Sequence, residues 1–312
     1  MTHNRQFRFA VQHTHAPDGA AWINMARSAE DSGVSVFSMP DHLGDLFSPI
    51  PALAAVAAVT RTIKLSMFVL CNDNRHPGLL AKEIATLDAI SNGRVELGLG
   101  AGWTRTEYDA LGMPFDSPGT RIERLGEAVK ILRGTFGEEK YSFTGKHYQV
   151  TDLAIRPRPV RPSGIPIVLG GGGRKMLSLA AREADIVSIA ANNQLRPAMD
   201  SPFTGFGFKQ VSEQAGWVRE AAGERYASLE LNVRVLAVVI NPDREAAARE
   251  LSSSLGVPAE DLLDSPLVFI GDLGQIEEQI VRMREQLGIS YFTISQRHAA
   301  PLLPLIRRMT GR

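Results

Sequence analysis

Short runs of apolar and β-branched residues alternate with longer segments in which apolar residues recur three and four positions apart. The first pattern predicts strands and the second predicts helices. The predicted strands are residues 7–12, 34–39, 63–70, 94–100, 165–169, 185–190, 231–240 and 290–295. The predicted helices are residues 20–32, 51–60, 77–91, 121–136, 175–184, 207–222, 244–255 and 276–287. Eight strand–helix repeats predict an α/β fold, a (β/α)₈ TIM barrel, as one domain over residues 1–312.

Local signals agree with this assignment. Residues 165–169 are almost continuously apolar, as expected for a strand that is covered on both faces. Gly33 and the pair Asn92-Gly93 follow predicted helices and tolerate the positive φ that ends a helix, while Pro77 suits a first helical turn.

Two insertions interrupt the repeat. Residues 138–150 alternate around Thr144-Gly145-Lys146 and predict a hairpin. Residues 191–208 combine asparagine, proline, glycine and phenylalanine and predict a long lid loop. Long loops in compact barrels are usually functional, so the lid loop is expected to contribute to a substrate pocket.

Composition narrows the possible partners. Lys and Arg number 34 against 34 Asp and Glu, so the chain lacks the basic excess that binds nucleic acid. No run of 18 apolar residues predicts a membrane span, and Cys71, the single cysteine, suits a reducing compartment. The seven histidines show no metal-ligand spacing. We therefore expect a cytoplasmic protein with a small-molecule substrate, without nucleic-acid, membrane or metal binding.

In a barrel of this type, reactive groups follow the C-terminal ends of the strands. Asp41 and His42 follow the second predicted strand, and His42 is a candidate acid or base because imidazole titrates near neutral pH. Alternatively, Asp41 caps a turn and His42 is a bystander. After the third strand, Arg75 and His76 could meet an anion, although Arg75 could equally pair with Asp73.

Glycines follow or end two further strands. Gly98, Gly100 and Gly102 precede Trp103, and could either admit a flat ligand or relieve crowding. A stronger signal lies between a strand and a helix, where four glycines precede two cations: Gly170, Gly171, Gly172, Gly173, Arg174 and Lys175. Exposed amide groups at a helix N-terminus favour an anion, so this loop predicts a phosphate site, with a flexible turn as the alternative.

Taken in order, these segments resemble the bacterial luciferase-like oxidoreductases that use a flavin or a deazaflavin. The block RHPGLLAKEIATLDAISNGRVELGLGAGW at residues 75–103 carries most of the resemblance, which runs from Phe7 to the last helix. The members that depend on coenzyme F420 are the most similar subset.

The resemblance implies that a tricyclic ring lies against the C-terminal ends of the strands and that the protein is a homodimer. It implies a non-proline cis peptide at Phe68–Val69, at the end of the third strand, and gives His42 the role of ring-side acid or base. It also assigns cofactor contacts to Asp41, Phe68, Val69, Gly100, Ala101, Gly102, Trp103, Gly170, Gly171, Gly172, Gly173 and Arg174.

One departure separates this chain from relatives that oxidise sugar phosphates, because Trp103 stands where those relatives place a proton-donating glutamate. The predicted function is hydride transfer between F420 and an unidentified organic substrate. The alternatives are a monooxygenase that uses reduced FMN and a non-catalytic relative that kept only the barrel.

Overall fold

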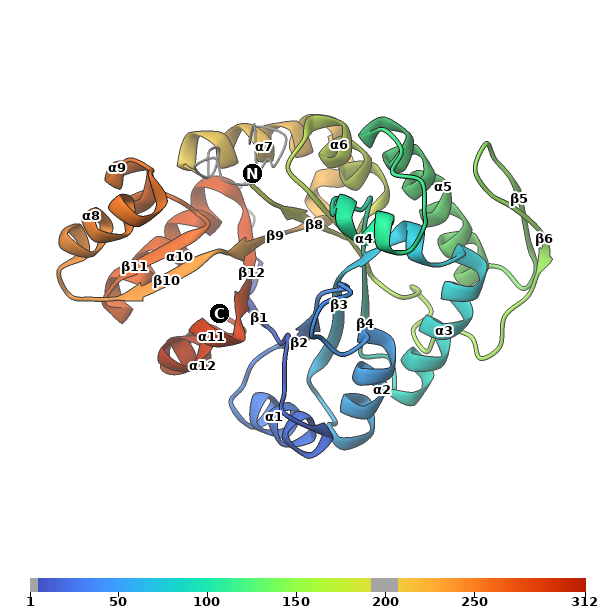
Figure 1. The fold of residues 1–312 in the computed structure, drawn as a ribbon, viewed down its shortest axis with the longest axis horizontal. Helices are drawn as coiled ribbons and strands as arrows, with labels where there is room; N and C mark the ends of the chain where they lie inside the picture. Colours follow the sequence, from blue (N-terminus) through green and yellow to red (C-terminus); the bar gives the residue numbers. More distant parts are fainter. Residues whose placement is uncertain (1–4, 192–206) are drawn as a thin grey trace. The chain divides into compact units, whose positions relative to one another are not determined.

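The computed structural model describes residues 5–191 and 207–312 (Figure 1). Eight parallel strands form a closed barrel in the order β1-β12-β9-β8-β7-β4-β3-β2. They are β1 (Arg8–Gln12), β2 (Val36–Met39), β3 (Lys64–Cys71), β4 (Val95–Gly100), β7 (Ile167–Gly171), β8 (Ile186–Ile189), β9 (Glu230–Val235) and β12 (Ile289–Ser295). Each of the eight predicted strands overlaps one of these, so the predicted (β/α)₈ barrel is confirmed.

Helices connect the strands in the predicted alternation. They are α1 (Gly19–Asp31), α2 (Pro49–Val59), α3 (Pro77–Ile90), α4 (Arg105–Ala110), α5 (Pro118–Gly137), α6 (Arg174–Glu183), α7 (Phe208–Ala222), α8 (Arg244–Leu255), α9 (Ala259–Leu263), α10 (Leu273–Leu287), α11 (Gln296–Ala299) and α12 (Leu303–Met309). The expected helix ends are confirmed, because Gly33, Asn92 and Gly93 have positive φ and Pro77 opens α3.

The chain forms two compact units. One comprises residues 13–31 and 36–169, with β2, β3, β4 and the helices α1 to α5. The other comprises residues 1–12, 32–35 and 170–312, with β1, β8, β9, β12 and the helices from α6 onward. Their cores combine apolar residues of the strands and of the helices. All six residues of β4 and all four residues of β8 are buried, as expected for strands covered on both faces.

The predicted strand at residues 231–240 is divided into two strands in the structure. Residues 231–240 divide into β9 and β10 (Ala237–Ile240), and β10 pairs in parallel with β11 (Val268–Gly271) in a separate two-stranded sheet. The division falls at Leu236, whose N–H donates to Leu267 O at 2.7 Å, outside the barrel. Both segments are rich in β-branched residues, so residue type alone did not mark the change of partner.

The predicted hairpin is confirmed as β5 (Tyr141–Thr144) and β6 (Gln149–Leu153), which pair antiparallel. The Glu127 carboxylate of α5 holds its turn by accepting the N–H groups of Lys146, His147 and Tyr148. Burial raises the pKa of Glu127, but these backbone hydrogen bonds outweigh it and leave the pKa below its usual value. Most of the predicted lid loop, residues 192–206, lies outside the described residues.

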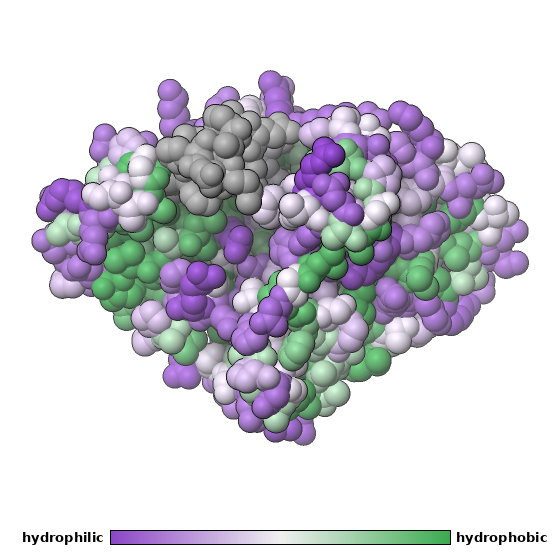
Figure 2. Space-filling model, viewed as in Figure 1, coloured by the Kyte–Doolittle hydropathy of each residue, from purple (hydrophilic) through white to green (hydrophobic). Residues whose placement is uncertain are grey.

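Within residues 5–191 and 207–312, no helix combines the length and the apolar character needed to cross a membrane. Figure 2 shows hydrophobic residues scattered among hydrophilic ones on the face that it presents. The exposed large hydrophobic side chains include Leu79 and Ile90 on α3 and Leu43 and Trp103 in the loops that follow β2 and β4.

Candidate active site

Asp41, two residues after β2, joins the ends of two strands. Its Oδ2 accepts the N–H of Cys71 at 3.1 Å and a hydrogen bond from Arg75 Nη1 at 2.7 Å, while Oδ1 accepts from Arg75 Nη2 at 3.3 Å. The Asp41 side chain is only 8% exposed. A bidentate, mostly buried ion pair of this kind fixes geometry, so Asp41 holds the loop that presents His42.

His42 is bound on one side and open on the other. Its Nδ1 lies 2.9 Å from Glu107 Oε1 on α4, and the same oxygen accepts the N–H of Leu43 at 3.3 Å. Because an ionised carboxylate only accepts, Nδ1 carries the donated proton. No described residue bonds to Nε2, and the side chain is 34% exposed. The imidazole is therefore oriented by Glu107 and presents Nε2 to a ligand.

Trp103 adds a flat apolar surface beside this imidazole. Its ring meets the His42 ring edge-on, with the centroids 5.9 Å apart, and the residue is 57% exposed. Leu43, the neighbour of His42, is exposed as well. An exposed aromatic face next to an oriented imidazole fits a flat tricyclic ring, because such a ring can pack against the indole while its polar edge meets Nε2.

The peptide Phe68–Val69 is cis, as the resemblance predicts. The register of β3 against β4 shifts between Met67 and Leu70, so two residues of β3 lie opposite Gly98. A Cβ on Gly98 would lie 1.9 Å from Met67 O, and one on Gly100 would lie 2.8 Å from Val69 Cγ2. These two glycines thus make room for the bulge of β3, which supports the interpretation that they relieve crowding.

Gly102 has a different role. Its φ is +76°, and a Cβ there would lie 2.1 Å from Tyr108 Oη and 3.0 Å from Cys71 Sγ. The glycine therefore lets the chain turn sharply from β4 into α4 over the buried Tyr108 ring. Burial raises the pKa of Cys71, which keeps it a neutral thiol.

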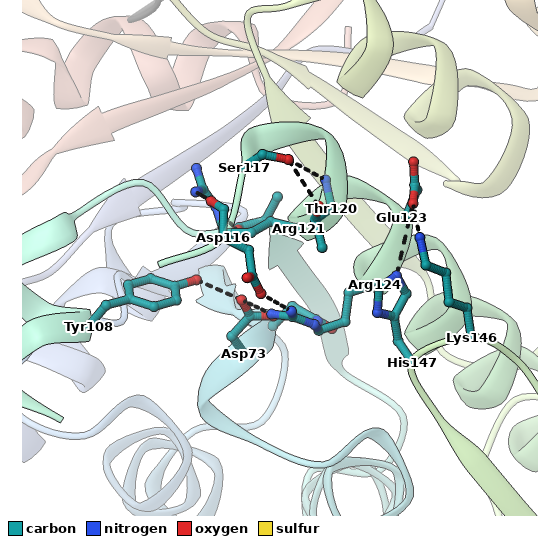
Figure 3. A network of polar contacts seen from close by, with 12 residues as sticks. Asp73, Tyr108, Asp116, Ser117, Thr120, Arg121, Glu123, Arg124, Lys146 and His147 are labelled. Carbon is teal, nitrogen blue, oxygen red and sulfur yellow. Dashed lines mark hydrogen bonds and ion pairs between the residues drawn. The ribbon is translucent and has the colours of Figure 1, made fainter. Parts of the chain in front are cut away.

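A polar network anchors α4 to its surroundings (Figure 3). Tyr108 Oη donates to Asp73 Oδ2 at 2.9 Å, and Arg124 Nη1 on α5 donates to the same oxygen at 2.7 Å. Arg124 also pairs with Asp116. Because Tyr108 is the neighbour of Glu107 in α4, this network fixes the helix from which Glu107 reaches His42.

Arg75 and His76 are engaged in the described structure. Arg75 pairs with Asp41, so the expected alternative pairing with Asp73 is wrong; Asp73 is taken by Tyr108 and Arg124. His76 is the N-cap of α3, where its Nδ1 accepts the N–H of Gly78 at 3.1 Å. Neither side chain is free to serve mainly as an anion ligand.

The predicted glycine loop lies in the other compact unit, where Gly170 and Gly171 are the last two residues of β7 and Gly172 and Gly173 lead into α6. Gly173 is the N-cap of α6, a helix of ten residues, so the N–H groups of its first turn have no partners within the helix. Arg174, at the start of α6, forms an exposed ion pair with Glu220 at 2.8 Å. Gly172 O accepts from Gln214 Nε2 at 2.8 Å, which holds the loop against α7.

Glu107 is the functional candidate that the sequence analysis missed. Residues 105–110 were not predicted as a helix, although Thr104 and Glu107 have the spacing of a capping box, which marks a helix start. In the structure Thr104 makes no side-chain cap, and Glu107 contacts His42 instead. The spacing could have revealed α4, but only the fold brings Glu107 to His42.

Comparison with known proteins agrees with the fold. The F420-dependent glucose-6-phosphate dehydrogenase of Nakamurella multipartita is 33% identical over 170 residues, which are 52% of this chain and 49% of that protein. The matches cover between about half and two thirds of the curated relatives' length, 49% to 64%.

Solved structures share the whole fold at low sequence identity. An F420-dependent secondary alcohol dehydrogenase in complex with an F420-acetone adduct superimposes with a TM-score of 0.77 at 17% identity, covering 98% of both chains. EDTA monooxygenase from Chelativorans sp. BNC1 gives 0.75 at 14% identity, covering 99% of this chain and 95% of the other.

The sequence profile of the luciferase-like monooxygenases matches residues 3–283, nearly the whole chain. The match includes the β3 bulge, the His42 loop and the glycine loop. The chain therefore belongs to the luciferase-like monooxygenase family.

Proposed function

We propose that this protein is an oxidoreductase that transfers a hydride between coenzyme F420 and a small organic substrate. Two observations on relatives support the choice of cofactor. The named curated relatives at 32% and 33% identity are F420-dependent dehydrogenases, and an F420-dependent alcohol dehydrogenase shares the fold. When bound, the deazaflavin supplies the hydride acceptor or donor.

The observation that carries the proposal is the His42–Glu107 pair beside Trp103. Glu107 accepts a hydrogen bond from Nδ1 at 2.9 Å and thereby leaves Nε2 as the nitrogen that faces a substrate. Neutral His42 takes a proton at Nε2 when an alcohol is oxidised, and protonated His42 returns it when an unsaturated substrate is reduced. The negative charge of Glu107 stabilises the imidazolium in either direction.

The remaining residues of the proposed site bind the cofactor. Trp103 packs against the ring, and Phe68, Val69, Gly100, Ala101 and Gly102 form the backbone that borders it, with Asp41 fixing the loop of His42. Gly170, Gly171, Gly172, Gly173 and Arg174 hold the cofactor phosphate through amide groups at the start of α6. Arg174 exchanges its exposed partner Glu220 at little cost, because exposed ion pairs contribute at most about 1 kcal/mol.

The proposal also includes a homodimer, as the resemblance to the family implies, and, from the composition, a small-molecule substrate and a cytoplasmic location. Sedimentation or light scattering of the purified chain tests the dimer directly. A monomer at micromolar concentration would remove this part of the proposal without affecting the chemistry.

Two parallel assays test the function. In the first, F420 absorbance is followed with a panel of alcohols, and reduced F420 is followed with a panel of unsaturated acceptors, for the wild type and for His42→Asn. In the second, oxygen consumption is measured with reduced FMN and the same panel. F420-linked turnover that His42→Asn abolishes supports the proposal. Substrate-dependent oxygen consumption would assign the chain to the FMN monooxygenases instead.

A further inference from the structure

The strand β9 carries two charged residues on the face that points into the barrel. Ser188 Oγ donates to Asn232 Oδ1 at 2.8 Å, and Asn232 Nδ2 donates to Thr293 Oγ1 at 3.0 Å, so these three buried side chains form one row. Phe292, the neighbour of Thr293, faces the other way, because its ring packs 5.8 Å from Phe269 of β11. The row therefore lies inside the barrel.

Side chains two residues apart along a strand share a face. Glu230 lies two residues before Asn232, and Arg234 lies two residues after it, toward the C-terminal end of β9, so all three side chains share one face. Glu230 has a cation partner, because Arg8 Nη1 donates to its Oε2 at 2.6 Å. Among the described residues, Arg234 has no carboxylate partner and no hydrogen bond.

A second cation approaches Arg234 from the helix that follows β12. Arg234 pairs in register with Thr293 of β12, and α11, which carries Arg297, begins directly after β12. In agreement with this placement, partial burial lowers the pKa of Arg234, and the positive charge of Arg297 lowers it further. The next residue, His298, responds in the same way, since burial and Arg297 both lower its pKa. No Asp or Glu within residues 5–191 and 207–312 forms an ion pair with Arg234, Arg297 or His298.

These cations are also reachable by a solute. Arg234 and Arg297 are exposed, whereas Val233 and Val235, which flank Arg234, are buried. Two guanidinium groups held close together without a carboxylate repel each other, and an anion between them would remove that cost. The planar donor forks of arginine match the paired oxygens of a carboxylate or a phosphate.

We propose that Arg234 and Arg297 form a binding subsite for the carboxylate or phosphate group of a small-molecule ligand. The subsite goes beyond the proposed hydride transfer, because it depends on neither the cofactor nor His42. It lies at the C-terminal ends of β9 and β12, the end of the barrel at which ligand groups bind in folds of this type. The anionic group belongs either to the substrate or to the acidic tail of the cofactor, and the two sources share the same chemistry.

Phosphate binding to the purified full chain tests the subsite. Inorganic phosphate, and acetate in a second series, are titrated in an anion-poor buffer while Tm and binding heat are recorded. The variants are Arg234→Gln and Arg297→Gln. The control is Arg249→Gln, which removes an exposed arginine of α8 that pairs only loosely with Glu245, at 3.8 Å.

Loss of one charged hydrogen-bonding partner should raise the Kd for the probe about tenfold to a hundredfold in both variants and leave the control unchanged. In the anion-poor buffer, Arg234→Gln should also keep or raise the Tm, because it relieves the repulsion. A merely structural arginine would lower the Tm. Unchanged probe affinity in both variants, or no saturable response of the wild type to either probe, overturns the proposal.

A final measurement, F420 binding by Arg234→Gln, distinguishes the two sources of the anionic group. If Arg234→Gln weakens F420 binding as much as phosphate binding, the subsite takes the cofactor tail. If only phosphate or acetate binding weakens, the subsite takes an acidic substrate. Because phosphate binding requires no turnover, failure of hydride transfer would leave these results readable.

Discussion

At the scale of single residues, three side chains have separate roles at the proposed active site. Asp41 fixes the loop after β2 through Arg75 and the N–H of Cys71. His42 presents Nε2, and Glu107 binds the opposite ring nitrogen. The sequence marks Asp41 and His42 by their place at a strand end, but Glu107 is 65 residues away from His42. Such a pairing depends on tertiary structure, which is why residue patterns alone did not reveal it.

Replacement of His42 by Asn tests its role as acid or base. The amide keeps the size and polarity of the position but cannot take up a proton at neutral pH. Turnover should fall about 10² to 10⁴-fold while the cofactor Kd stays within about threefold of the wild type. Steady-state kinetics and a cofactor titration on the same preparation check this. Full turnover in the variant would remove His42 from the mechanism.

Replacement of Glu107 tests its role as a positioning residue. Glu107→Ala removes the acceptor of the Nδ1 proton, so kcat should fall about tenfold to a hundredfold, the typical value of a hydrogen bond to a charged group. Glu107→Gln keeps an acceptor without the charge and should restore part of the loss.

The pH profile distinguishes positioning from a general loss of structure. Without the carboxylate, protonated His42 loses a stabilising charge, so the pH dependence of kcat should differ from that of the wild type in both Glu107 variants. An unchanged profile, with equal activity in the Ala and Gln variants, would contradict the assigned role.

At the scale of elements, the closest fit in the structure is between β3 and β4. The bulge of β3 occupies the space above Gly98 and Gly100, and Gly102 opens the turn into α4. From the sequence, these glycines could either admit a flat ligand or relieve crowding, and the structure supports relief of crowding for Gly98 and Gly100. The spacing of the glycines could not decide between the two interpretations, because both require a residue without a side chain at these positions.

Gly98→Ala tests this fit. Its Cβ would lie 1.9 Å from Met67 O, so backbone must move, and the variant should lose about 1–3 kcal/mol of stability or more. Gly216→Ala in α7 is the matched control, since nothing lies within 4 Å of its Cβ. That helical control should gain about 0.5–1 kcal/mol. Chemical denaturation measures both; equal stability of the two variants would contradict the account.

The elements themselves were largely predictable. The pattern of apolar and β-branched residues located all eight barrel strands, although some of them also carry buried polar residues, such as Asn232 of β9. It failed where periodicity carries no information about partners, as at Leu236, where one apolar run serves two sheets. It also failed for α4, a helix of six residues that is too short to show a repeat.

At the scale of the whole molecule, the buried His13 side chain makes the free energy of unfolding fall in acid. Burial lowers the pKa of His13 to about 3, and its ring stacks on Phe37 with the centroids 3.9 Å apart. The folded state thus holds His13 neutral, whereas the unfolded chain takes up a proton near pH 6.5. Its contribution is therefore complete above pH 6.5 and is lost as the pH falls from 6.5 toward 3, by about 2 kcal/mol at pH 5.

His13→Phe should keep the ring stack and remove this dependence. The difference in unfolding free energy between wild type and variant should change between pH 6.5 and 4.5. Glu30, whose pKa is lowered to about 2, contributes acid sensitivity only below its usual 4.5, because backbone hydrogen bonds from residues 61–63 outweigh its burial. Parallel stability profiles of the two proteins over pH 6.5 to 4.5 would contradict the assignment to His13.

The central claim is that the chain binds a deazaflavin against Trp103 and His42. The most direct measurement is titration of the purified protein with F420 and, separately, with FMN, by ligand fluorescence at fixed salt, for the wild type and for Trp103→Ala. We expect saturable, micromolar or tighter binding of F420, weaker binding of FMN, and loss of F420 affinity in the variant. Tighter binding of FMN, no binding of either cofactor, or F420 binding that ignores Trp103 would contradict it.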